Sequence, residues 1–76
     1  MEHYRTSRLQ AIDVIREWDL NFSLGNVVKY VGRAGKKKSA SREEDLLKAL
    51  WYLVYELTDD TDYADDCVDT IKSDMD

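Results

Sequence analysis

The chain has 76 residues, of which 43% are hydrophobic and 36% are charged, and its formal net charge is −5. This length allows one domain, at the lower limit for a self-sufficient core, and the composition is that of a folded protein rather than a disordered one. A single cysteine excludes an intramolecular disulfide, and one histidine with one cysteine does not make a zinc site. Small domains without a disulfide or a metal site are commonly stabilised by a partner subunit, so we expect a homo-oligomer.

Apolar residues occur only in short runs. None of these runs approaches the roughly 20 residues that are needed to span a bilayer. Residues 1–8 are polar and lack the apolar core of a signal peptide. Together with the low cysteine content, this predicts a cytoplasmic protein with no membrane contact.

The negative charge is concentrated at the C-terminal end. Residues 1–58 carry ten Lys or Arg and eight Asp or Glu, whereas residues 59–76 carry one Lys and eight Asp. We therefore divide the chain into a mildly basic helical domain, 1–58, and an acidic tail, 59–76. Three interpretations of the tail are open: a solvated, disordered end, a segment that folds back and masks basic residues, or a mimic of nucleic-acid charge.

The spacing of apolar residues predicts an all-α fold, a small domain of three to four helices. In the first helix, residues 7–18, apolar side chains recur every three or four positions, and Ser7 is the expected N-cap. The second helix is expected to start at Asn21 or Ser23 and to end just before Gly35. Asn and Ser favour helix starts, and Gly adopts the left-handed conformation that often follows a helix end.

The third helix has the most apolar surface. It starts after Ser41, with Glu44 three residues later in the pattern of a capping box. Its apolar residues cover more than half of its circumference: Leu46, Leu47, Leu50, Trp51, Leu53, Val54 and Leu57. We expect this wide face to pack against more than its own chain and to form the oligomer contact. The tail has a weak amphipathic pattern that allows a short fourth helix, although its aspartates lower helix propensity.

Residues 29–42, here called the basic hairpin, contain no acidic residue and six basic ones: Lys29, Arg33, Lys36, Lys37, Lys38 and Arg42. Guanidinium and ammonium groups are suited to phosphate, and free N–H groups at the start of the third helix favour anions. Tyr30 is suited to stacking on a base. Composition alone leaves a plain solvated basic face as an equal alternative. A P-loop is excluded, because the glycine spacing is wrong and no strand precedes it.

Several segments resemble the phage SaV-like family of small phage proteins: residues 12–15 (IDVI), 20–31 (LNFSLGNVVKYV), 33–37 (RAGKK) and 44–53 (EDLLKALWYL). His3 and Tyr4 resemble a short element that precedes the first helix of that family. One member triggers a host abortive-infection system by protein contact. A longer relative is a phage nucleotide kinase that works without a P-loop and assembles into a large oligomer. The resemblance, over residues 3–56, implies a location in the host cytoplasm.

The resemblance also implies a set of ligand-binding positions: Asn21, Asn26, Lys29, Tyr30, Arg33, Lys36, Lys37, Asp45 and Lys48. Magnesium is expected only together with a nucleotide. Asp45 stays a candidate ligand for magnesium. Glu43 and Glu44 are better explained by the favourable interaction of negative charge with the start of a helix.

Two functions are consistent with these observations. The first is binding of a phosphate-bearing small ligand, chiefly a nucleotide, at the basic hairpin. Phosphoryl transfer of the nucleoside monophosphate kinase type is left open, because such chemistry depends mostly on positioning and charge stabilisation. The second is a non-enzymatic protein that engages a host factor, such as a component of a defence system.

Overall fold

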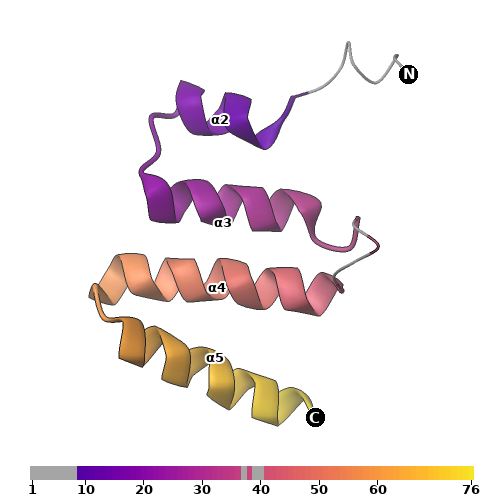
Figure 1. The fold of residues 1–76 in the computed structure, drawn as a ribbon, viewed down its shortest axis with the longest axis vertical. Coiled ribbons are helices and arrows are strands. Elements are labelled where there is room, and N and C mark those ends of the chain that lie inside the picture. The colour runs from indigo at the N-terminus through magenta and orange to yellow at the C-terminus, as the bar shows by residue number, and fades with distance from the viewer. Residues whose placement is uncertain (1–8, 37, 39–40) are drawn as a thin grey trace.

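The computed structural model describes residues 9–36, 38 and 41–76, and it confirms the predicted all-α fold. These segments contain four helices: α2 (Ala11–Glu17), α3 (Phe22–Arg33), α4 (Arg42–Thr58) and α5 (Thr61–Met75). The helices run back and forth in an antiparallel meander, so that each one contacts only its neighbours in the sequence (Figure 1). In the part of the chain that the structure describes, no helix is long and apolar enough to cross a membrane.

Both ends of α3 and the start of α4 lie where the sequence predicts them. Asn21 caps α3, because its side-chain oxygen accepts a hydrogen bond from the Leu24 N–H at 2.9 Å. The Ser41 hydroxyl caps α4 in the same way and accepts from the Glu44 N–H at 3.0 Å. After α3, Gly35 has a φ of +79°, a conformation that glycine adopts without steric cost. Both helix starts and the turn between them are therefore determined by local side-chain chemistry.

The first helix is shorter than expected. It begins at Ala11 rather than Ser7, and Gln10 is its N-cap. The Gln10 N–H donates to the Asp13 carboxylate at 2.9 Å, which satisfies one backbone group that would otherwise be free at the helix start. The predicted cap, Ser7, lies outside the described residues, as do His3 and Tyr4.

The acidic tail is not a disordered end, because most of it forms the 15-residue helix α5. Asp60 caps this helix by accepting a hydrogen bond from the Tyr63 N–H at 3.0 Å. Ala64 is fully buried against α4, and the Trp51 indole of α4 donates to Asp65 at 2.7 Å. Because α5 contacts α4 and not α3, the acidic helix does not cover the basic residues of α3 within one chain.

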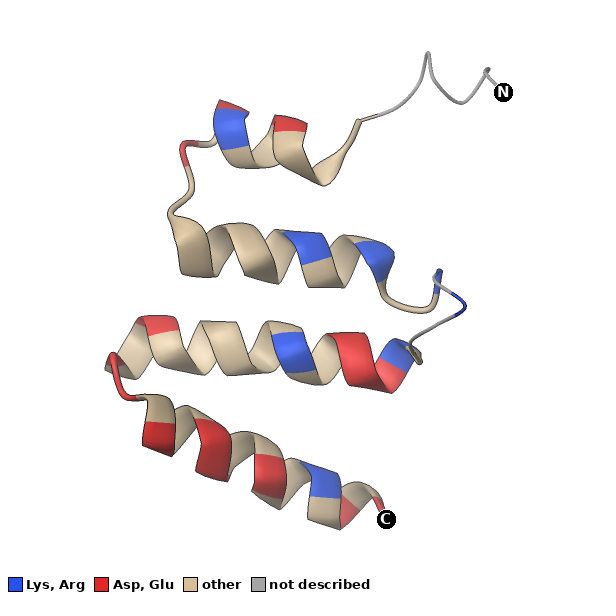
Figure 2. Ribbon diagram, in the orientation of Figure 1, with Lys and Arg blue, Asp and Glu red and all other residues tan. Residues whose placement is uncertain are grey.

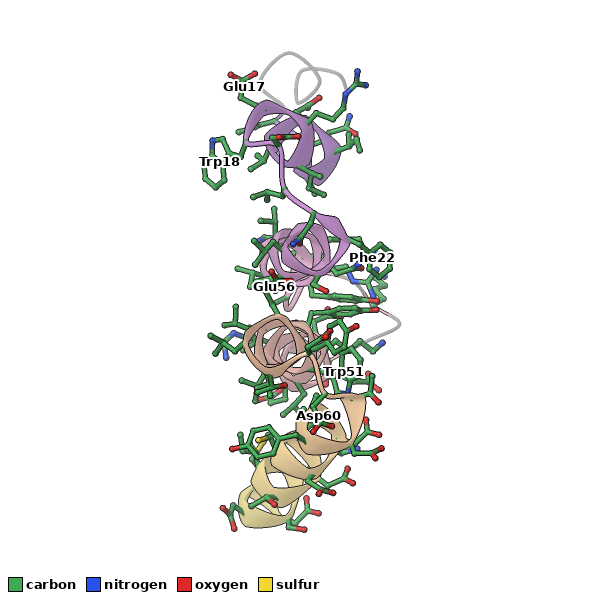
Figure 3. All side chains as sticks on the ribbon, turned by 90° about the vertical axis from the view of Figure 1, so that its left-hand side faces the viewer. Glu17, Trp18, Phe22, Trp51, Glu56 and Asp60 are labelled. Atoms are coloured by element: carbon green, nitrogen blue, oxygen red, sulfur yellow. The ribbon has the colours of Figure 1, made fainter. Side chains whose placement is uncertain are left out.

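The four helices form a single layer. The chain extends 41 × 29 × 13 Å, so it is one helix thick, as the edge-on view in Figure 3 shows. Its radius of gyration is 14.2 Å, whereas a compact domain of this length is expected to have about 11 Å. Of the described hydrophobic residues, only Ala49 and Ala64 are buried. The layer therefore has two broad faces, each accessible to solvent.

Candidate functional site

A buried ion pair joins the end of α3 to the start of α4. Asp45 is fully buried, and its Oδ1 accepts a hydrogen bond from Arg33 Nε at 3.2 Å. The Arg33 side chain is 30% exposed, so the rest of its guanidinium reaches the surface. A charge-assisted bond of this kind contributes about 1.5–3 kcal/mol. It fixes the register of the two helices that carry the basic residues.

The ring of Tyr30 lies at the centre of a group of cations from α3 and α4. Lys29 Nζ lies 5.0 Å from the ring centroid, Arg33 Cζ 4.8 Å and Lys48 Nζ 5.6 Å. All three distances are within the range in which a cation is attracted by an aromatic ring. The three cations therefore converge on one ring, although they come from two helices, and Figure 2 shows basic residues on both α3 and α4.

Aromatic rings extend this group across α4. Tyr30 stacks on Tyr52, with centroids 6.1 Å apart and planes 13° from parallel. Tyr52 in turn meets Phe22 and Trp51 edge-on, at 6.0 and 5.1 Å. We call the side of the layer that carries Phe22, Lys29, Tyr30, Lys48 and Tyr52 the site face. It combines flat apolar surfaces with mobile positive charges.

Two hollows lie along α4. One, of about 320 Å³, is lined by Tyr30, Lys48, Trp51 and Tyr52. The other is larger, about 550 Å³, and lies between α4 and α5, where Glu43 and Glu44 accompany two lysines. The carboxylates of the larger hollow would repel an anion. The smaller hollow has a cation and aromatic walls, so it is the better site for an anionic aromatic ligand.

The remaining predicted ligand positions lie elsewhere or have other partners. Along the axis of α3, Asn21 and Asn26 lie about 14 and 6 Å from Tyr30. Asn21 caps the helix and donates to Glu56 at 3.0 Å, and Asn26 donates to the Phe22 carbonyl at 2.9 Å. Lys36 donates to the Gly32 carbonyl at 2.9 Å at the end of α3. Lys37 lies outside the described residues.

The carboxylates at the start of α4 face different surroundings. Glu43 and Glu44 are exposed in the first turn, where negative charge stabilises the helix. They oppose the expected binding of an anion at that helix start. Asp45 is turned inward against Arg33, and its Oδ2 has no hydrogen-bond partner. In the described segments, no cluster of three or more His, Cys, Asp or Glu is arranged to hold a metal ion.

Sequence reasoning missed the contribution of Tyr52 and assigned Trp51 only to a core or an interface. Tyr52 lies one helical turn after Lys48, so the two side chains share a side of α4. This spacing was the only signal in the sequence. The stacking on Tyr30 depends on how α4 lies against α3, which residue spacing does not specify.

The fold and the site define a small all-α protein with a cationic aromatic surface. A family model described as a protein of unknown function, DUF3310, matches residues 1–54. The chain belongs to this family. The match includes α2, α3 and most of α4 and ends before α5. Neither the curated proteins nor the solved structures contain a significant match to the chain.

Proposed function

We propose that this protein binds a phosphate-bearing small ligand, chiefly a nucleotide, at the site face. The observation that carries the proposal is the position of Tyr30, which has three cations within 6 Å of its ring and a second ring stacked on it. Flat rings favour a base, and the ammonium and guanidinium groups favour a phosphate. Both halves of a nucleotide thus have suitable partners within one small area.

The three cations have different roles in this proposal. Lys29 and Lys48 are exposed and have no acidic partner among the described side chains, so they are available to a phosphate. Arg33 is held by Asp45 and presents only part of its guanidinium. We therefore assign phosphate contact to the two lysines and a positioning role to the Arg33–Asp45 pair.

The resemblance to the phage SaV-like family supports the same ligand class, because the phage nucleotide kinase that it includes handles deoxynucleoside monophosphates. The proposal is one of binding, and it assigns no turnover to this chain. A kinase-like transfer would use magnesium bound together with the nucleotide. Asp45, the carboxylate left open for that ion, is paired with Arg33.

A thermal-shift panel tests the proposal. The ligands are mono-, tri- and cyclic nucleotides, with inorganic phosphate and a nucleoside as probes of the two halves. A ligand at 100 times its Kd adds about 2.7 kcal/mol of stability, which raises the Tm of a domain of this size by about 10–20 °C. We expect a shift with nucleotides and smaller shifts with either half alone.

Two variants make the test specific. Replacing both Lys29 and Lys48 with alanine should abolish the shift without unfolding the protein, because both side chains are exposed. Lys72→Ala is the matched control, since it removes an exposed lysine from α5, which does not contact α3. If no nucleotide shifts the Tm, the proposal fails and the alternative, a non-enzymatic protein that engages a host factor, is favoured.

A further inference from the structure

The side of α4 opposite the site face carries a row of leucines. On α4, four leucines are separated by four, three and four residues: Leu46, Leu50, Leu53 and Leu57. This spacing places them in one row along the helix, as in the contact row of a coiled coil. The row lies about 140–200° around α4 from Lys48. We call this row the leucine stripe.

Neighbouring helices extend the same apolar side. On α3, Val31 lies 180° around the helix from Phe22, and it is 53% exposed. Figure 3 shows Trp18, which is 66% exposed, pointing away from the side that carries Phe22. Both charged residues of α3, Lys29 and Arg33, lie on the site face, so the apolar side of α3 carries no charge.

The leucine stripe is only partly covered by its own chain. α4 packs against α3 on one side and α5 on the other, which accounts for much of its wide apolar surface. Leu53 nevertheless stays 42% exposed and Leu57 82% exposed. Each fully covered leucine would contribute about 1.5–3 kcal/mol relative to an exposed one. A partner molecule that covers these leucines would therefore add stability that a layer one helix thick lacks.

We propose that a second copy of this chain covers the apolar side, with the two leucine stripes facing each other across a two-fold axis. The broad side of the layer measures 41 by 29 Å, an outline of about 1,200 Å², so covering about two thirds of it reaches the roughly 800 Å² per partner of a stable dimer. A row of leucines is complementary to itself, as a two-fold contact requires. Two layers of 13 Å packed back to back form a two-layer structure with a closed apolar core.

This arrangement leaves both site faces exposed to solvent, so it is independent of the ligand proposal. It also centres the contact on α4 and not on the acidic helix α5, which is the outermost helix of the layer (Figure 1). The eight aspartates of residues 59–76 are then not at the centre of the contact. Association does not require the like-charged helices to pack on each other.

Sedimentation equilibrium on the full chain tests the dimer. Leu57→Lys places a charge on the leucine stripe, and Phe22→Lys is the matched control on the site face, since the two residues are 82% and 77% exposed. We expect a mass of twice 8.9 kDa for the unaltered protein. Leu57→Lys should weaken dimerisation by about a hundredfold, because a two-fold dimer contains the substitution twice at roughly tenfold each.

Circular dichroism verifies that both variants keep their helices, so a loss of association is not a loss of folding. Phe22→Lys should leave the dimer constant within about threefold, on the order of the change expected for a residue outside the contact. The proposal is overturned if the unaltered chain has the mass of a monomer, or if it forms an assembly that Leu57→Lys does not weaken. A dimer that only Phe22→Lys disrupts would overturn it as well.

Discussion

Asp45→Ala removes the buried carboxylate that holds Arg33 against α4. The change deletes a charge-assisted hydrogen bond of 3.2 Å and leaves a guanidinium that is only 30% exposed without its partner. Loss of such a bond costs about 1.5–3 kcal/mol, and full loss of a buried pair costs about 3–5 kcal/mol. Because Arg33 retains some access to water, we expect about 2–3 kcal/mol, or about 10–20 °C in Tm for a domain of this size.

Urea unfolding of a double-mutant cycle measures this coupling. The cycle compares Asp45→Ala, Arg33→Met and the two together, at one protein concentration so that any association does not change between samples. We expect Arg33→Met to be the more harmful single change, because it leaves the fully buried Asp45 without a partner. The coupling energy should be about 1 kcal/mol or more. If the loss of stability in the double mutant equals the sum of the losses in the two single mutants, the pair does not fix the α3–α4 register.

Two further predictions concern backbone and charge. Gly32 lies in α3, and a methyl group added there meets no neighbouring atom within 4 Å, so Gly32→Ala should stabilise the protein by about 0.5–1 kcal/mol. Gly35 has a φ of +79°, so Gly35→Ala should destabilise the protein by about 1 kcal/mol. Chemical unfolding of the two variants measures both effects. The negative charge of Asp59 raises the pKa of Tyr55 above 10.0. The stability that the protonated Tyr55 contributes is therefore fully present below pH 10, and it is lost as the pH rises through the raised pKa of the folded protein. Asp59→Asn should lower the phenol pKa in an ultraviolet titration, and an unchanged titration would contradict that cause.

The features that sequence reasoning predicted correctly are those that depend on near neighbours. The Asn21 and Ser41 caps are each satisfied by an N–H three residues away, and Gly35 follows the helix that it ends. Such contacts need no knowledge of the rest of the fold. The apolar periodicity of α4 is similarly a property of one helix.

The features that residue spacing left open depend on packing. The sequence allowed a short fourth helix, and α5 forms over 15 residues, stabilised by the buried Ala64 and by the bond from Trp51 to Asp65. Tertiary contacts outweighed its low intrinsic propensity. Part of the wide apolar face of α4 packs on two helices of the same chain, and the oligomer contact expected for the rest of it stays a prediction.

The candidate site was predicted only in part. Lys29, Tyr30 and Arg33 share a helix, so their proximity follows from spacing. The convergence of Lys48 and Tyr52 on the same ring required the register between α3 and α4. That register is held by Arg33 and Asp45, which both belong to the predicted set of ligand positions, although here they contact each other.

The most direct test of the central claim is a titration of the ¹⁵N-labelled protein with a deoxynucleoside monophosphate, followed by amide chemical shifts. We expect saturable changes grouped on the site face, at Lys29, Tyr30, Lys48 and Tyr52. Added salt should reduce these changes, because it screens exposed charges. Amides of the leucine stripe should remain constant. An absence of saturable changes, or changes centred on the apolar side, would contradict a phosphate-ligand site at Tyr30.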